Sequence, residues 1–199
     1  MNPKSLLNEF NLRPIKSLGQ HFLSSDSRVK SIVDALDLPE GLTVVEIGPG
    51  LGALTDVLAE RRVRVVAVEK DPKLISILRD RYQSATDRVR VINQDFLEYT
   101  FEDVRNGEKC VVFGNLPYYI SSPILFHLVE FRDKISSAVL TLQREVAQRL
   151  VSKPNSKEYG RLTLSFGLFA QVKHLFDIRR NEFYPQPRVG SSTILIEFR

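Results

Sequence analysis

The chain is poor in the residues that crosslink proteins or bind metals. Its 199 residues include one cysteine, Cys110, so an intramolecular disulfide is excluded. This composition is typical of a protein from a reducing compartment. The three histidines are scattered along the chain without metal-ligand spacing, and we therefore expect no metal site.

Long apolar runs are missing as well. No stretch approaches the roughly 20 apolar residues that a membrane helix needs, and the first 17 residues lack the apolar centre of a secretory signal. The apolar share of 43% and the charged share of 26% are ordinary for a globular domain. We expect a monomeric, cytoplasmic protein of one domain with no membrane partner.

Charge is distributed unevenly, although the net charge is only +4. Residues 1–30 carry a net +3, residues 31–110 a net −4 and residues 111–199 a net +5. Two basic ends around an acidic centre are compatible with a basic face that binds a polyanion such as nucleic acid. A solvated surface with a chance imbalance explains the same numbers, so charge alone leaves both interpretations open.

Strand-like and helix-like segments alternate along most of the chain. The predicted strands are Thr43–Ile47, Val63–Val68, Val89–Asn93, Cys110–Gly114 and Ala138–Leu142. The predicted helices are Leu51–Arg62, one from Pro72 to about Tyr82 capped by Asp71, one that opens at Ser121 or Ser122, and Arg144–Val151. Alternation of this kind implies right-handed crossovers and a mostly parallel sheet with helices on both faces.

The C-terminal part has a different pattern. Tyr159–Ala170 predicts a helix, and the polar segment Lys153–Glu158 before it predicts an exposed loop. Val172–Ile178 and Ser192–Phe198 predict two strands joined by a proline-rich loop, and hence an antiparallel pair. The expected fold is an α/β, Rossmann-like domain with seven strands, in which residues 1–30 form an N-terminal arm and residues 31–199 the core.

The first predicted strand runs directly into a glycine-rich turn. Gly48, Gly50 and Gly52 follow Glu46 with the spacing G-x-G-x-G. Glycines at such a turn let the backbone approach a ligand closely, and ligands in open α/β sheets bind beyond the carboxyl ends of the strands. The spacing differs from the dinucleotide fingerprint G-x-G-x-x-G, which points away from a nicotinamide cofactor and toward S-adenosylmethionine. A tight turn without any ligand accounts for the glycines equally well.

Two carboxylates follow the next two strands. Glu69 ends the second strand, 21 residues after Gly48, where a carboxylate commonly accepts hydrogen bonds from ribose hydroxyls. Asp95 follows the third strand, where it could accept a hydrogen bond from an adenine amino group, with Phe96 beside the ring. The plainer alternatives are a solvated acid for Glu69 and a turn or cap residue for Asp95.

The most specific motif is Asn115-Leu116-Pro117-Tyr118, which ends the fourth strand. It resembles the Asn/Asp-Pro-Pro-Tyr motifs of enzymes that methylate exocyclic amino groups. The lone pair of an adenine amino group is delocalised into the ring, and two acceptors on its hydrogens favour a pyramidal, nucleophilic nitrogen. We expect the Asn115 side-chain oxygen and the Leu116 carbonyl to be these acceptors. Pro117 fixes the backbone, and Tyr118 offers a face for an extruded base.

The whole set of motifs resembles the small-subunit ribosomal RNA adenine N6,N6-dimethyltransferases (KsgA type), which have the class I S-adenosylmethionine-dependent methyltransferase fold. The matching segments are GQHFL (19–23), VEIGPGLGALT (45–55), VEKDP (68–72), NQDFL (93–97), NLPYYISSPIL (115–125), QREVAQRL (143–150), YGRLT (159–163) and FYPQPRVGSS (183–192). They follow one another in family order across nearly the whole chain.

The resemblance implies a set of site residues. Those expected at the cofactor, S-adenosylmethionine, are His21, Leu23, Gly48, Gly50, Glu69, Lys70, Asp95, Phe96 and Asn115. Asn115 would sit between the methyl donor and the target amine, and Tyr118 and Phe183 would hold the two faces of the target adenine. The expected partner is small-subunit rRNA within a pre-ribosomal small subunit. Apart from the resemblance, six basic residues outside the pocket could contact phosphates, and a solvated surface explains each of them equally well: Arg144, Arg149, Lys153, Lys157, Arg161 and Arg188.

Two departures from the family pattern stand out. Tyr119 occupies a position where many bacterial members have asparagine, which would alter the rim of the pocket. The chain also ends at Arg199, where the catalytic domain of the family usually ends, and the resemblance therefore leads us to expect that the family's small helical C-terminal domain is absent. We expect cofactor binding to survive without that domain, whereas docking on the ribosomal particle is in question.

Three other functions fit parts of the sequence. A related enzyme that methylates large-subunit rRNA and confers antibiotic resistance usually has isoleucine after the motif asparagine, so Leu116 disfavours it. A non-enzymatic protein of the same fold could bind RNA or serve ribosome assembly or transcription. The intact Asn115–Tyr118 motif argues against a protein that has lost its catalytic activity. A nicotinamide-dependent oxidoreductase is disfavoured by the glycine spacing.

Overall fold

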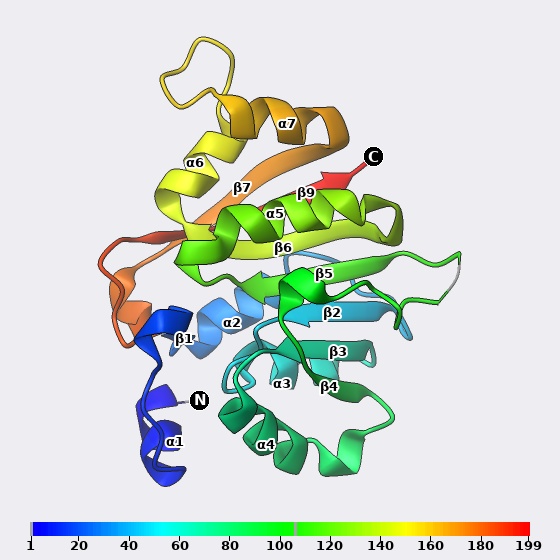
Figure 1. The fold of residues 1–199 in the computed structure, drawn as a ribbon, viewed down its shortest axis with the longest axis vertical. Coiled ribbons are helices and arrows are strands. Elements are labelled where there is room, and N and C mark those ends of the chain that lie inside the picture. The colour runs from blue at the N-terminus through cyan, green and yellow to red at the C-terminus, as the bar shows by residue number, and fades with distance from the viewer. Residues whose placement is uncertain (1, 106) are drawn as a thin grey trace.

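The computed structural model describes residues 2–105 and 107–199, and its centre is a seven-stranded sheet of order β4-β3-β2-β5-β6-β9-β7 (Figure 1). The strands are β2 (Thr43–Ile47), β3 (Arg64–Glu69), β4 (Val89–Asn93), β5 (Cys110–Asn115), β6 (Ile135–Gln143), β7 (Ala170–Ile178) and β9 (Ser191–Phe198). The first five pair in parallel, whereas β9 runs antiparallel to both of its neighbours. The predicted mostly parallel α/β sheet with an antiparallel C-terminal strand is confirmed.

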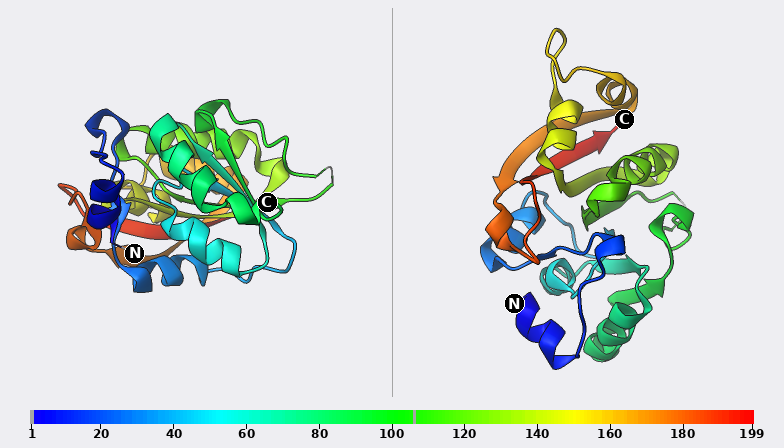
Figure 2. Two further views of the ribbon diagram at one scale, coloured as in Figure 1. Left: turned by 90° about the horizontal axis from the view of Figure 1, so that it is seen from below. Right: turned by 60° about the vertical axis from the view of Figure 1, so that its left-hand side comes forward.

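Helices cover both faces of this sheet (Figure 2). The helices α2 (Asp26–Val33), α3 (Ala53–Glu60) and α4 (Pro72–Arg81) pack on one face, and α5 (Ser121–Glu130), α6 (Arg144–Val151) and α7 (Arg161–Phe169) pack on the other. Side chains alternate between the two faces along each strand. Val111 therefore packs with the first group of helices and Val112 with the second. No helix in the described parts of the chain is long and apolar enough to span a bilayer.

Local sequence patterns predicted the ends of most helices and strands to within one or two residues of their positions in the structure. The Asp71 side chain accepts a hydrogen bond from Lys73 N, and Pro72 begins α4 as predicted. The helix predicted from Leu51 instead begins at Ala53, because Gly52 has a φ of 86° and caps it. β6 begins at Ile135, three residues before the predicted start at Ala138. The segment Lys153–Glu158 is a largely exposed loop, as expected.

The N-terminal arm contains structure that sequence patterns did not show. It includes α1 (Pro3–Glu9) and β1 (Phe22–Leu23), and β1 pairs antiparallel with β8 (Phe183–Tyr184). This pairing places the arm beside the loop that precedes β9, as Figures 1 and 2 show. The helix α2 runs across residue 30, the expected end of the arm. Short 3-10 helices complete the chain at Lys16–Leu18, Gln83–Ala85, Phe96–Glu98, Tyr118–Ile120, Arg132–Lys134 and Arg180–Glu182.

The start of α3 is tightly packed, and we expect Gly52→Ala to lower the free energy of unfolding by about 3 kcal/mol. A Cβ at residue 52 would lie 2.7 Å from Tyr82 Oη, in addition to the strain of the left-handed backbone. Urea unfolding measures the loss. Gly41→Ala is the matched control, because Gly41 also has a positive φ but a Cβ there would meet nothing within 4 Å. Equal losses in both variants would contradict the expected clash with Tyr82.

Candidate functional site

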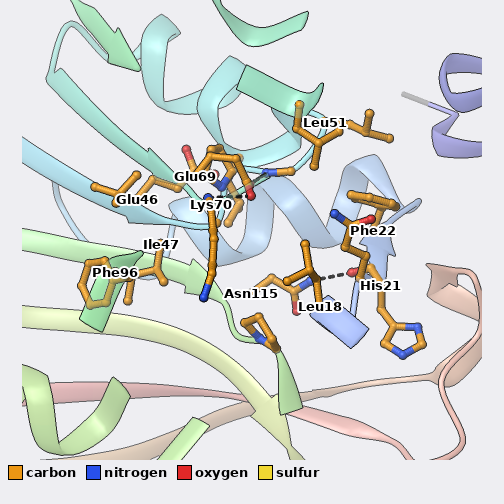
Figure 3. Close-up of a pocket in the computed structure, with 18 of the residues that line it drawn as sticks. Leu18, His21, Phe22, Glu46, Ile47, Leu51, Glu69, Lys70, Phe96 and Asn115 are labelled. Atoms are coloured by element: carbon orange, nitrogen blue, oxygen red, sulfur yellow. Dashed lines mark hydrogen bonds between the residues drawn. The ribbon is translucent and has the colours of Figure 1, made fainter. Parts of the chain in front are cut away.

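A pocket lies at the carboxyl ends of β2, β3, β4 and β5 (Figure 3). Parallel strands bring their carboxyl ends to one edge of the sheet, so residues far apart in the sequence converge there. The predicted cofactor residues that line the pocket are His21, Leu23, Gly48, Gly50, Glu69, Lys70, Asp95, Phe96 and Asn115, and Pro117 of the motif joins them. The structure thus gathers all nine predicted cofactor residues around one cavity.

The glycine turn after β2 is tied to the carboxylate at the end of β3. Glu69 Oε2 accepts a hydrogen bond from Gly50 N at 3.1 Å, and Glu69 Oε1 accepts from the backbone N–H groups of residues 70 and 71, each at 2.9 Å. Burial raises the pKa of Glu69, and these three donors partly offset the effect. A Cβ on Gly50 would lie 3.0 Å from the Phe22 ring, so glycine is needed where the arm crosses the turn. The carboxylate is consequently held in one orientation at the pocket wall.

Lys70 and Asp95 form an ion pair beside this carboxylate, with Lys70 Nζ 2.6 Å from Asp95 Oδ2. Asp95 also accepts a hydrogen bond from Leu97 N and caps the following 3-10 helix. Partial burial raises the pKa of Asp95, but the hydrogen bonds from Lys70 and Leu97 outweigh it, and the net pKa is lowered. The hydrogen bond to Asp95 raises the pKa of Lys70. Asp95 is therefore an ionised acceptor at neutral pH.

Asn115 ends β5, and its side chain is oriented by the N-terminal arm. Asn115 Nδ2 donates a hydrogen bond to the main-chain oxygen of His21 at 2.8 Å (Figure 3). Because the amide nitrogen is used in this way, Asn115 Oδ1 remains the atom that can accept a hydrogen bond from a ligand. Leu116 is buried, and its N–H donates to Thr141 O at 2.9 Å, which fixes the backbone where the motif begins.

Tyr118 lies beside the pocket instead of lining it. Its ring stacks on the His21 ring with centroids 5.6 Å apart and planes 26° apart, and its hydroxyl is 2.6 Å from Ser191 Oγ. The neighbouring Tyr119 lines the pocket mouth and is 55% exposed. This agrees with the expectation that Tyr119 shapes the rim.

Phe183 is adjacent to one predicted site residue, Leu23, but does not line the pocket itself. Its side chain is only 4% exposed, it is paired with Leu23 across β1 and β8, and it packs in the core on the α2–α3 side of the sheet. It is not among the residues that line the pocket. In this arrangement Phe183 has no free face for a base, because its ring is packed in the core.

Sequence reasoning missed two residues that organise the site. Glu46 was noted only for its spacing to the glycines, yet it lines the pocket, is buried, and accepts a hydrogen bond from Thr55 Oγ1 at 2.6 Å. Burial raises the pKa of Glu46 to about 8. Gln20 Nε2 donates to Asp71 Oδ2 at 2.8 Å and thereby joins the arm to α4. The GQHFL segment was the available signal for Gln20.

Comparison with known proteins decides the family. The family model described as "Ribosomal RNA adenine dimethylase" matches residues 11–199. The chain belongs to this family. Among its curated relatives, "Ribosomal RNA small subunit methyltransferase A" of Syntrophus aciditrophicus is 42% identical over 194 residues, which cover 96% of this chain and 69% of the relative. The "Probable ribosomal RNA small subunit methyltransferase A" of Methanopyrus kandleri is 43% identical over 189 residues, which cover 95% of this chain and 66% of the relative. The chain thus spans about two thirds of these relatives' length.

Two solved structures of transferases have the same fold as this dimethylase-family chain. A dimethyladenosine transferase from Plasmodium falciparum superposes with a TM-score of 0.80 at 28% identity and covers 89% of this chain and 63% of that one. The 23S rRNA methyltransferase ErmE superposes with a TM-score of 0.76 at 29% identity, and the match covers 89% of this chain and 70% of ErmE. Within residues 2–105 and 107–199, no group of three or more His, Cys, Asp or Glu side chains is placed to hold a metal ion.

Proposed function

We propose that this dimethylase-family domain transfers methyl groups from S-adenosylmethionine to N6 of two adjacent adenosines in a hairpin near the 3′ end of small-subunit rRNA, within a pre-ribosomal small subunit. The observation that carries the proposal is the orientation of Asn115. Its amide nitrogen donates a hydrogen bond to His21 O, and its oxygen is left to accept a hydrogen bond from a target amino group. The family of the chain supplies the substrate class.

The residues around the pocket fit S-adenosylmethionine. Glu69, held by three backbone donors, would accept hydrogen bonds from the ribose hydroxyls. Asp95 would accept a hydrogen bond from the adenine amino group, and Lys70 keeps its carboxylate ionised. A Cβ on Gly48 would meet nothing within 4 Å, which is consistent with a turn that faces a ligand. The main chain of the arm at His21 and Leu23 would close the methionine end.

The chain's own groups then orient the target amine. The cofactor supplies an electrophilic methyl group on a sulfonium centre. Asn115 Oδ1 and the Leu116 carbonyl would accept the two amino hydrogens and leave the nitrogen lone pair directed at the methyl carbon. Pro117 constrains this backbone, and a base extruded from a single-stranded loop would stack on Tyr118. The transfer depends on positioning, and the methylated amine releases its proton to water.

Basic side chains in two parts of the molecule, around the α6–α7 loop and around the loop before β9, would contact the RNA backbone. Arg149, Lys157 and Arg161 line a shallow surface hollow between α6 and α7. Lys153 lies in the exposed loop between these helices, and Arg188 is exposed before β9. Arg144 forms an ion pair with Asp177 at 3.1 Å, so it would have to leave this partner to bind a phosphate.

A transfer assay tests the proposed function. We expect the protein, incubated with labelled S-adenosylmethionine and unmethylated small ribosomal subunits, to form N6,N6-dimethyladenosine at two adjacent positions, identified by mass spectrometry of the digested RNA. Calorimetry with S-adenosylmethionine is measured alongside. Cofactor binding without transfer would show that this domain does not find the proposed substrate. Loss of both would contradict the methyltransferase assignment for the chain.

Large-subunit rRNA is the second candidate substrate, because ErmE, a 23S rRNA methyltransferase, also superposes well. Leu116 and the higher identity to the small-subunit methyltransferases favour the first candidate. The same assay with unmethylated large subunits separates them. Methylated adenosine in 23S rRNA alone would reverse the preference.

A further inference from the structure

The side chain of His21 is held between the catalytic motif and the loop before β9. His21 Nδ1 lies 2.7 Å from the main-chain oxygen of Pro185. Because a carbonyl oxygen can only accept, Nδ1 carries a hydrogen and donates it. The ring stacks on Tyr118, while the main-chain oxygen of the same residue accepts the hydrogen bond from Asn115. In Figure 3 the His21 carbonyl faces Asn115 and the ring points away from it.

Tertiary structure holds this arrangement in place. The pairing of Phe22 with Tyr184 brings His21 next to Pro185, although 164 residues separate the two along the chain. The Tyr118 ring is then restrained at two points, on one face by His21 and at the hydroxyl by Ser191 Oγ. Each restraint reaches the motif from a different segment. Because His21 occupies one face of the ring, a base could stack only on the other.

We propose that His21 is a positioning residue for the target adenine. Its ring fixes the plane of Tyr118, so the extruded base stacks on the opposite face, and its carbonyl fixes the amide of Asn115. The inference rests on the proposed function of Asn115 and Tyr118. It gives the His21 side chain a task separate from the cofactor contact, which the main chain of the arm would make.

Kinetics of three variants at residue 21 test the proposal. We expect His21→Ala to raise KM for the RNA by about tenfold, because a lost aromatic stack leaves Tyr118 free to rotate. The main-chain contact to Asn115 remains, so kcat and the Kd for S-adenosylmethionine should stay within about threefold of the wild type. His21→Phe keeps a flat ring and should restore most of KM, whereas His21→Asn keeps only a donor toward Pro185 and should restore little.

A double-mutant cycle with Tyr118→Ala separates positioning from general damage. If His21 acts through Tyr118, His21→Ala should change KM by less than about twofold in the Tyr118→Ala background. The same tenfold increase in both backgrounds would overturn the proposal. An unchanged KM in His21→Ala, or a loss of S-adenosylmethionine affinity as large as the change in KM, would also overturn it.

If the wild type transfers no methyl group, the proposed function fails, but the arrangement of His21 can still be tested by spectroscopy. Long-range proton–nitrogen NMR of the three histidines should show a protonated Nδ1 on His21. Removal of the Tyr118 ring should shift the carbon-bound ring protons of His21 through the lost ring current, while those of exposed His174 stay in place. Unshifted His21 protons, or an unprotonated Nδ1, would overturn the arrangement on which the proposal depends.

Discussion

Asn115→Ala is expected to lower methyl transfer to rRNA by at least about 100-fold while S-adenosylmethionine still binds. The Asn115 oxygen is the acceptor that would orient the target amine, and its amide nitrogen is the group that ties it to His21 O. Alanine removes both without filling the pocket. The carboxylates of Glu69 and Asp95, which we propose bind the cofactor, are held by other partners, so calorimetry should give a Kd close to that of the wild type.

The control for this prediction is Asn8→Ala on the exposed side of α1. It removes the same amide group outside the pocket and should leave the transfer rate unchanged. Single-turnover transfer with saturating RNA separates the chemical step from RNA binding. A rate in Asn115→Ala within about threefold of the wild type would contradict the role assigned to this side chain.

Glu46→Gln is expected to change how stability depends on pH. Burial raises the pKa of Glu46 to about 8 from an ordinary value of 4.5. The folded state therefore keeps this proton over a range in which the unfolded chain has released it. The contribution of Glu46 to the free energy of unfolding should be greatest below pH 4.5 and should fall as the pH rises toward 8, because the unfolded state gains by ionising this group.

The glutamine variant lacks this titration. Each pKa unit corresponds to about 1.4 kcal/mol. Between about pH 4 and pH 8, the wild type should therefore lose roughly 5 kcal/mol of unfolding free energy relative to Glu46→Gln. Urea unfolding across this range measures it. Glu60→Gln, at the exposed end of α3, is the matched control and should follow the wild type. A parallel course for Glu46→Gln and wild type would show that Glu46 ionises normally in the folded protein.

Local patterns predicted the core elements well. The residue ranges expected for β2, β4 and α6 match the structure, because a buried strand or an amphipathic helix is encoded in a few neighbouring residues. The β1–β8 pair was missed for the converse reason. Two strands of two residues each have no periodicity, and the residues that pair are 160 and 162 positions apart in the sequence.

The candidate site was predictable where the residue types themselves carry the chemistry. The glycine turn, Glu69, Asp95 and Asn115 follow successive parallel strands, and the topology of such a sheet brings them together. Phe183 differs from these residues, because its role was implied only by the resemblance and depends on where a loop that is distant in the sequence lies. In the structure this segment pairs with Leu23, and the Phe183 ring is buried in the core.

By itself, the sequence determined the α/β class, the order of the motifs and the chemistry that the Asn115–Tyr118 motif can perform. Only the tertiary structure decided which atom of the Asn115 amide is available, because that depends on a carbonyl 94 residues away. It also decided the pKa of Glu46, since the desolvation that raises it comes from groups packed around the side chain from several elements. Orientation and desolvation are properties of the assembled core, which no local pattern encodes.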